Sequence, residues 1–196
     1  DAVFVETDVT DEASVRRAVQ ACVDQFGKLD TLYNNAGGST MNDGPVTEAP
    51  IEEFWRVITL DLFGTFLLSR HAIPKIVEAG GGSVINTASN VALMALPGRD
   101  CYTAAKGGVA SMTRSMAAEY AAHKIRVNAV APSATRTERV AAMAAREPNI
   151  ERLVDGHLLG WCEPEHIAYM ALYLASDESA VTTGQVIPVD SGITVI

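Results

Sequence analysis

Tyr102 and Lys106 lie four residues apart, in the run Cys101-Tyr-Thr-Ala-Ala-Lys-Gly-Gly108. On a helix this spacing places a phenol and an ammonium on one face. A free phenol ionises near a pKa of about 10, so its use as a base near neutrality requires about 4 kcal/mol of phenolate stabilisation. An ammonium ~4 Å away supplies about 1 kcal/mol in bulk water and about 4 kcal/mol at the effective dielectric of protein. The pair can therefore perform acid–base chemistry in a partly closed cleft, although the same spacing also arises on helices with no catalytic role.

The elements that must position this pair alternate between short β-rich runs and longer amphipathic ones. This pattern predicts a parallel sheet with helices on both faces. The length of 196 residues, with 48% hydrophobic content, predicts one globular domain over residues 1–196. Strands are expected over 2–7, 29–34, 83–87, 125–130 and 185–189, and helices over 11–26, 51–79 (with Pro74 as a kink or break), 101–122 and 163–175, with short helices within 137–160.

Composition narrows the classes of function. The net charge of −9 repels phosphate backbones and anionic lipid, so neither nucleic acid nor a membrane surface is an expected partner. No apolar run approaches the roughly 18 residues of a transmembrane helix, and no secretory signal is visible. The three cysteines form no CxxC pair, which favours a reducing compartment such as the cytoplasm. His71, His123, His157 and His166 show no metal-ligand spacing, so they are interpreted as structural or surface residues and no metal site is expected.

Further motifs accompany the Tyr/Lys pair in a fixed order along the chain. They are Asp8-Val9, Asn34-Asn-Ala-Gly37, Ser89 (thirteen residues before Tyr102), Arg126-Val-Asn-Ala-Val-Ala-Pro132 and Gly184-Gln-Val-Ile-Pro-Val-Asp190. With these segments the chain resembles the short-chain dehydrogenase/reductase family over nearly its whole length. In an open parallel sheet, ligands bind beyond the carboxyl ends of the strands, where several of these motifs are expected to converge.

The resemblance implies a Rossmann-like, doubly wound parallel sheet and an oxidoreductase that uses NAD or NADP to interconvert a secondary alcohol and a ketone. It implies that Ser89 donates a hydrogen bond to the substrate carbonyl and that Tyr102 transfers the proton. Lys106 would favour the phenolate and hold the nicotinamide ribose. Cofactor contacts are implied for Tyr102 and Lys106 and for Asp8, Val9, Asn35, Ala36, Gly37, Pro132, Ser133, Thr135 and Thr137.

Two positions depart from the family pattern. Asp61, in Thr59-Leu-Asp-Leu-Phe-Gly64, occupies the place of the usual catalytic Asn. A carboxylate there would keep Lys106 charged and disfavour a nearby phenolate, which predicts a modified proton relay with an alkaline-shifted optimum. The alternative is a helix residue with no catalytic role. Ser133 replaces a usual Gly, so the loop is expected to be slightly repositioned. Thr137 would face the carboxamide or simply cap the next helix.

The glycine-rich phosphate loop is absent from the sequence. The family places this loop upstream of Asp8, so the chain is expected to be the C-terminal three-quarters of a longer enzyme that lacks its first two strands. The 2–7 strand would then have lost its sheet neighbour. The chain alone is expected to bind no dinucleotide measurably and to be inactive.

Several alternatives stay open. One is a 3-oxoacyl-carrier-protein reductase, although the net charge of −9 offers little to an acidic carrier. Another is a non-catalytic binding protein on the same scaffold. Residues 137–161 resemble the family's substrate lid, where Met143, Leu158, Leu159 and Trp161 would either line an apolar pocket or pack the lid onto the body. The resemblance also implies a homotetramer built on the long helices and the C-terminal region. The substrate and the choice between NAD and NADP stay undecided.

Overall fold

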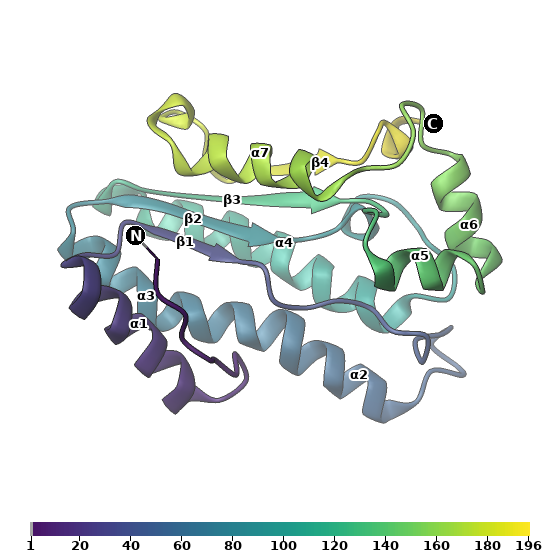
Figure 1. Cartoon of the computed structure of the whole chain (residues 1–196), viewed down its shortest axis with the longest axis horizontal. Helices are drawn as coiled ribbons and strands as arrows, with labels where there is room; N and C mark the ends of the chain where they lie inside the picture. Colours follow the sequence, from purple (N-terminus) through teal and green to yellow (C-terminus); the bar gives the residue numbers. More distant parts are fainter. Residues whose placement is uncertain (1) are drawn as a thin grey trace.

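A parallel four-stranded sheet forms the centre of the computed structural model, which describes residues 2–196 (Figure 1). Its strands are β1 (Thr31–Asn34), β2 (Gly82–Thr87), β3 (Ile125–Pro132) and β4 (Val186–Val189), in the order β1-β2-β3-β4. Because all neighbouring strands pair in parallel, their carboxyl ends meet at one edge of the sheet. The expected α/β class and parallel sheet are confirmed.

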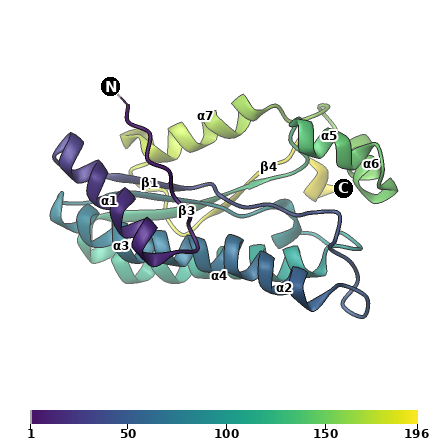
Figure 2. The same ribbon diagram turned by 60° about the horizontal axis from the view of Figure 1, so that its bottom comes forward.

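The helices are distributed unequally over the two faces. One face carries α1 (Glu12–Phe26), α2 (Ile51–Val57), α3 (Gly64–Glu78) and α4 (Asp100–Tyr120), and the other carries α7 (Pro164–Ala175), as Figures 1 and 2 show. Two short helices, α5 (Glu138–Ala144) and α6 (Pro148–Asp155), lie near the carboxyl ends of the strands. Since α7 covers the face opposite α3 and α4, the β3-to-β4 crossover has the opposite hand from the two before it.

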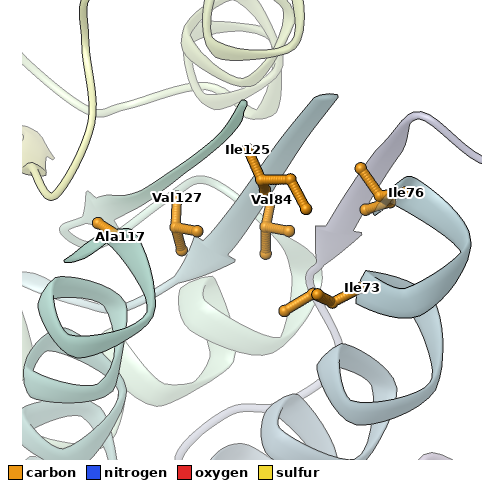
Figure 3. Packing of buried hydrophobic residues seen from close by; sticks show 6 residues of the cluster. All are labelled: Ile73, Ile76, Val84, Ala117, Ile125 and Val127. Carbon is orange, nitrogen blue, oxygen red and sulfur yellow. The ribbon is translucent and has the colours of Figure 1, made fainter. Parts of the chain in front are cut away.

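The sheet is apolar on both faces because helices cover both. On the α3/α4 side, Val84 and Val127 pack with side chains from α3, α4 and the start of β3 (Figure 3). On the other side, Ile85 and Val130 pack against Leu174 of α7. These β-branched residues, adjacent in sequence and packed on opposite faces, favour strand formation here.

Two expectations about the elements are wrong. Residues 2–7 form no strand, and Phe4 is 88% exposed. Within residues 2–196 no strand lies beside this segment, and an extended chain without a neighbour has no partner for its backbone hydrogen bonds. The helix expected over 51–79 is interrupted by a π-helical stretch, Ile58–Phe63, and it is not broken at Pro74. Helix α3 continues through Pro74 because Ile73 and Ile76 on either side of it are buried against the sheet.

In the described part of the chain, no helix is both long and apolar enough to cross a bilayer.

Candidate active site

A crevice of about 440 Å³ opens at the carboxyl edge of the sheet. It is bounded by the residues that follow β1, β2 and β3 and by the start of α4 and α7. Its walls bring together Ser89, which follows β2, and Tyr102 and Lys106, which lie on α4. The other lining residues are Tyr33, Asn35, Gly37, Gly38, Thr87, Ala88, Pro132, Ser133, Thr135, Thr137, Arg139, Val140, Pro164, Ile167 and Ala168.

Lys106 is almost fully buried and held by two oxygens. Its Nζ donates to the carbonyl of Thr87 at 2.8 Å and lies 3.0 Å from Oδ1 of Asp61. The same nitrogen is 5.6 Å from the centre of the Tyr102 ring, so the helical spacing does place the phenol beside the ammonium. An ammonium has three hydrogens to donate, and these two partners leave one for a ligand in the crevice.

Asp61 lies beneath the crevice floor with no solvent exposure. Its Oδ1 accepts the Gly38 N–H at 2.9 Å as well as facing Lys106, while its buried Oδ2 has no hydrogen-bond partner among residues 2–196. A Cβ on Gly37 would collide with this carboxylate, and Gly37 has a φ of +147°. Glycine is therefore required at position 37 both by the backbone conformation and by the close approach.

The π-helical stretch directs Asp61 to this place. Its i→i+5 hydrogen bonds widen one turn of the helix, a feature frequent at functional sites. The Asp61 carbonyl accepts a hydrogen bond from Oγ1 of Thr65 at 2.8 Å. On the preceding helix, Arg56 donates to the Gly38 carbonyl at 3.2 Å, so the Gly38 backbone is held through both its N–H and its carbonyl. Hydrogen bonds from Arg56 also lower the pKa of the buried Glu53 below its ordinary value.

The start of α4, which carries Tyr102, is capped by a distant loop. The two carboxylate oxygens of Asp43 accept the N–H groups of Cys101 and Tyr102 at 3.1 and 2.9 Å. In return, Asp100 accepts the Val46 N–H at 2.7 Å. These bonds satisfy free N–H groups of the first helical turn and place a negative charge at its positive end. They fix the backbone from which the phenol projects.

Ser89 is buried beside the crevice, directly after β2. Its Oγ donates to Oδ1 of Asn90 at 3.1 Å and lies 3.4 Å from the Pro132 carbonyl. It also accepts the Val91 N–H at 3.4 Å as the cap of a short 3₁₀ turn. Ser89 is thus both a strand-end cap and a hydroxyl at the site. Thr137 likewise has two roles, since it lines the crevice and caps α5.

Most of the expected cofactor contacts reach the crevice, and three do not. Asn35, Gly37, Pro132, Ser133, Thr135 and Thr137 line it together with Tyr102 and Lys106. Asp8 is exposed and accepts two hydrogen bonds from Thr10, Val9 packs against Gly64, and Ala36 is exposed outside the lining. Asp8 and Val9 stand apart because the expected strand before them is not in the sheet.

Sequence reasoning missed several residues of the site. Thr87 and Ala88 could have been predicted from the sequence, because they continue the expected strand 83–87 into the crevice. Arg139, Asn90, Asp43 and the buried His157 carry no local signal, because their roles depend on contacts across the fold. Cys101, next to Tyr102, packs in a core cluster, and burial raises the pKa of its thiol to about 11. It is therefore a protonated, inert thiol near neutrality.

A parallel α/β sheet with a Ser, Tyr and Lys gathered at its carboxyl edge places the chain in the Rossmann-like class of folds. The family model described as enoyl-(acyl carrier protein) reductase matches residues 1–194. The chain belongs to the short-chain dehydrogenase/reductase family.

Individual relatives agree with this family assignment. The chain is 39% identical to a cis-4-hydroxycyclohexanecarboxylate dehydrogenase of Sinomonas cyclohexanicum, an alignment that covers 100% of this chain and 78% of that one. It is 36% identical to a 3-oxoacyl-[acyl-carrier-protein] reductase of Thermotoga maritima, over 95% of this chain and 75% of the relative. Among solved structures, a short-chain type dehydrogenase/reductase from Mycobacterium ulcerans matches with a TM-score of 0.90 at 34% identity, over 96% of this chain and 69% of that one.

Proposed function

We propose that the protein interconverts a secondary alcohol and a ketone with NAD or NADP, and that Tyr102 is the acid and base of the reaction. The observation that carries this proposal is the meeting of Ser89, Tyr102 and Lys106 in one crevice. In the reductive direction, Ser89 donates a hydrogen bond to the substrate carbonyl and Tyr102 delivers the proton. In the oxidative direction, Tyr102 removes the hydroxyl proton.

The crevice fits the nicotinamide and ribose end of such a cofactor. Lys106 has one hydrogen free for ribose oxygens, and Gly37 and Gly38 let a ligand approach the backbone closely. Asn35, Pro132, Ser133, Thr135 and Thr137 would complete this wall. When bound, the nicotinamide supplies or accepts the hydride. We further propose that Asp61 takes part by holding Lys106 and the Gly38 backbone in place.

Turnover and binding test this proposal directly. Ketone-dependent oxidation of NADH or NADPH would be followed for the 196-residue chain and for a chimaera carrying the glycine-rich loop and first two strands of a relative. We expect the chimaera to bind dinucleotide in calorimetry and to reduce ketones. The chain alone should do neither measurably, because it contains no glycine-rich loop for the pyrophosphate. A chimaera that binds the cofactor but reduces no ketone would contradict the proposed function, and tight binding by the chain alone would contradict its dependence on that loop.

The position of Arg139 favours a substrate that carries a carboxylate. Its guanidinium lies against Gly38, where it lines both the crevice and an adjoining cavity of about 100 Å³ beside Ser89 and Tyr102. Within residues 2–196 no carboxylate forms an ion pair with Arg139, whereas Arg99, which also lines the cavity, pairs with Glu147. An exposed guanidinium beside a cavity that also presents Val140, Met143 and Leu153 suits a substrate with an apolar body and an anionic end. The carboxylate in the name of the Sinomonas relative's substrate agrees with this chemistry.

The active chimaera should therefore prefer 4-oxocyclohexanecarboxylate to cyclohexanone by at least about tenfold in kcat/KM, the size of a charge-assisted hydrogen bond. Arg139→Gln should remove this preference and leave cyclohexanone turnover nearly unchanged. Arg146→Gln, a matched change on an exposed arginine of the same region, should leave both unchanged. An equal loss on both ketones would instead assign Arg139 to the phosphates of the cofactor.

Two other functions are less well supported. A 3-oxoacyl-carrier-protein reductase agrees with the Thermotoga relative, but an acidic carrier would meet a chain with a net charge of −9. A non-catalytic scaffold protein would not need Ser89, Tyr102 and Lys106 in one crevice. Ketone turnover distinguishes an enzyme from the non-catalytic scaffold protein. A substrate panel that includes a 3-oxoacyl thioester distinguishes the 3-oxoacyl-carrier-protein reductase from the proposed dehydrogenase.

We also propose a cytoplasmic homotetramer. A groove of about 940 Å³ runs between α3 and α4, lined in part by Phe66, Met112, Met116 and Tyr120. Phe63 and Phe66 stack on each other at the surface and are 42% and 46% exposed. Apolar surface of this kind supports packing of these helices against a second copy. The three cysteines are free thiols, as a reducing compartment would keep them.

A further inference from the structure

Four buried polar side chains form a hydrogen-bond chain that leads from the active site to the segment that follows α6. Ser89 Oγ donates to Asn90 Oδ1 at 3.1 Å, and Asn90 Nδ2 donates to Ser133 Oγ at 3.1 Å. Ser133 Oγ lies 2.8 Å from Nε2 of His157. All four residues are at most 9% exposed. His157 belongs to the lid segment 137–161, so this hydrogen-bond chain connects the lid with Ser89.

The direction of this hydrogen-bond chain follows from the state of His157, because each member has few hydrogens to donate. A serine hydroxyl has one hydrogen to donate, and a neutral imidazole has one nitrogen that accepts. If Ser133 donates to Nε2 of His157, it can only accept from Asn90. Asn90 must then present its donor end to Ser133 and its acceptor end to Ser89. Every bond runs the same way, which strengthens each of them.

The surroundings of His157 favour this direction. Burial lowers the pKa of the imidazole below its ordinary value, while the nearby Asp190 carboxylate acts in the opposite sense. A neutral ring has one accepting nitrogen, and Ser133 Oγ, which already accepts from Asn90, has its one hydrogen left to donate to Nε2. The Nδ1 of His157 is buried and has no hydrogen-bond partner within the described residues, so the ring interacts with the site through Nε2 alone. Asp190 is itself occupied, because its carboxylate accepts hydrogen bonds from Gly192 and Thr194.

We propose that His157 is a positioning residue for the reaction, which as the terminal acceptor of this chain sets the orientation of Asn90 and thereby holds Ser89 in place. The resting Ser89 hydrogen is directed to Asn90 Oδ1, from which a substrate carbonyl can take it over. The lid segment and the serine are thus coupled by hydrogen bonds. This inference rests on the proposed function, in which Ser89 contacts the substrate oxygen.

Kinetics in the active chimaera test the coupling. His157→Leu removes the acceptor and should lower kcat for ketone reduction about tenfold with cofactor KM within about twofold, since it acts on Ser89 and not on the nucleotide. His157→Gln, whose amide oxygen can accept from Ser133, should restore most of the loss. In a Ser133→Gly background, His157→Leu should have no further effect, because the connection is already broken. His123→Leu, an exposed histidine, is the matched control. Additive losses, or an unchanged kcat for His157→Leu, would overturn the proposal.

A spectroscopic measurement tests the positioning role of His157 separately from the proposed ketone reduction. In ¹⁵N spectra of the 196-residue chain, His157 should be neutral with its proton on Nδ1, and the Asn90 side-chain amide should shift in His157→Leu. This readout needs neither cofactor nor turnover, so it remains informative even when no ketone is reduced. A proton found on Nε2 of His157, or an Asn90 amide that does not respond, would refute the direction of the chain.

Discussion

Tyr102→Phe in the active chimaera should lower kcat for ketone reduction by about 10²–10⁴-fold, the usual contribution of a positioned general acid. The change removes one oxygen and keeps the ring, which is half-buried beside Lys106. The backbone of Tyr102 stays capped by Asp43, so the start of α4 should not move. Initial rates at saturating cofactor measure the effect, and thermal unfolding checks that the fold is retained.

Tyr33→Phe is the matched control for this prediction. Tyr33 lines the same crevice, but no hydrogen bond of its hydroxyl is formed within residues 2–196. Losing this oxygen should change kcat by less than about threefold, because Tyr33 is on β1, away from the Lys106 ammonium that the proposed proton transfer uses. If Tyr102→Phe retained more than about a tenth of the activity, the phenol would not be the general acid.

Asp61→Ala should destabilise the fold by about 3–5 kcal/mol, the penalty for removing one partner of a buried ion pair. The ammonium of Lys106 would keep only the Thr87 carbonyl, and the Gly38 N–H would lose its acceptor. Urea unfolding followed by circular dichroism measures the change. Glu78→Gln, which breaks the exposed pair with Lys75, should cost less than about 1 kcal/mol. Equal effects of the two substitutions would mean that the Asp61–Lys106 pair does not hold the site together.

Asp61→Asn separates the stability of the site from its chemistry. The amide oxygen can still accept the Gly38 N–H, so the variant should unfold later than Asp61→Ala. Replacing this carboxylate by a neutral amide removes a negative charge beside Lys106, which should move the pH–rate profile of the active chimaera toward lower pH. An unchanged profile would show that Asp61 has no part in proton transfer.

Local patterns were sufficient for the parts of the site that depend on spacing along one element. Tyr102 and Lys106 share a helix face, and Ser89 follows a strand end, so their types and positions were readable in the sequence. The contact between Asp61 and Lys106 was expected from the family position of Asp61. The structure brings these residues together at the edge where parallel strands end.

The remainder depends on contacts between distant residues. Asp43 caps a helix whose first N–H groups lie almost sixty positions away, and His157 meets Ser133 across 24 positions. The 2–7 segment has the composition of a strand, but a strand also requires a neighbour, which composition does not reveal. Sequence periodicity likewise gives no sign of the π-helical stretch, since one extra residue shifts the apolar spacing by only a single position.

That widened turn makes this stretch of the gene tolerant of one particular change in length. Helix α2 packs Val57 against α4, and α3 packs Ile73 and Ile76 against the sheet. A π-helical turn holds about one residue more than an α-helical turn, so deleting one codon within 58–63 would convert the stretch to α-helix and keep both faces on their partners. A one-codon deletion within α2 or α3 has no extra residue to absorb it and would rotate one of these faces by about 100°.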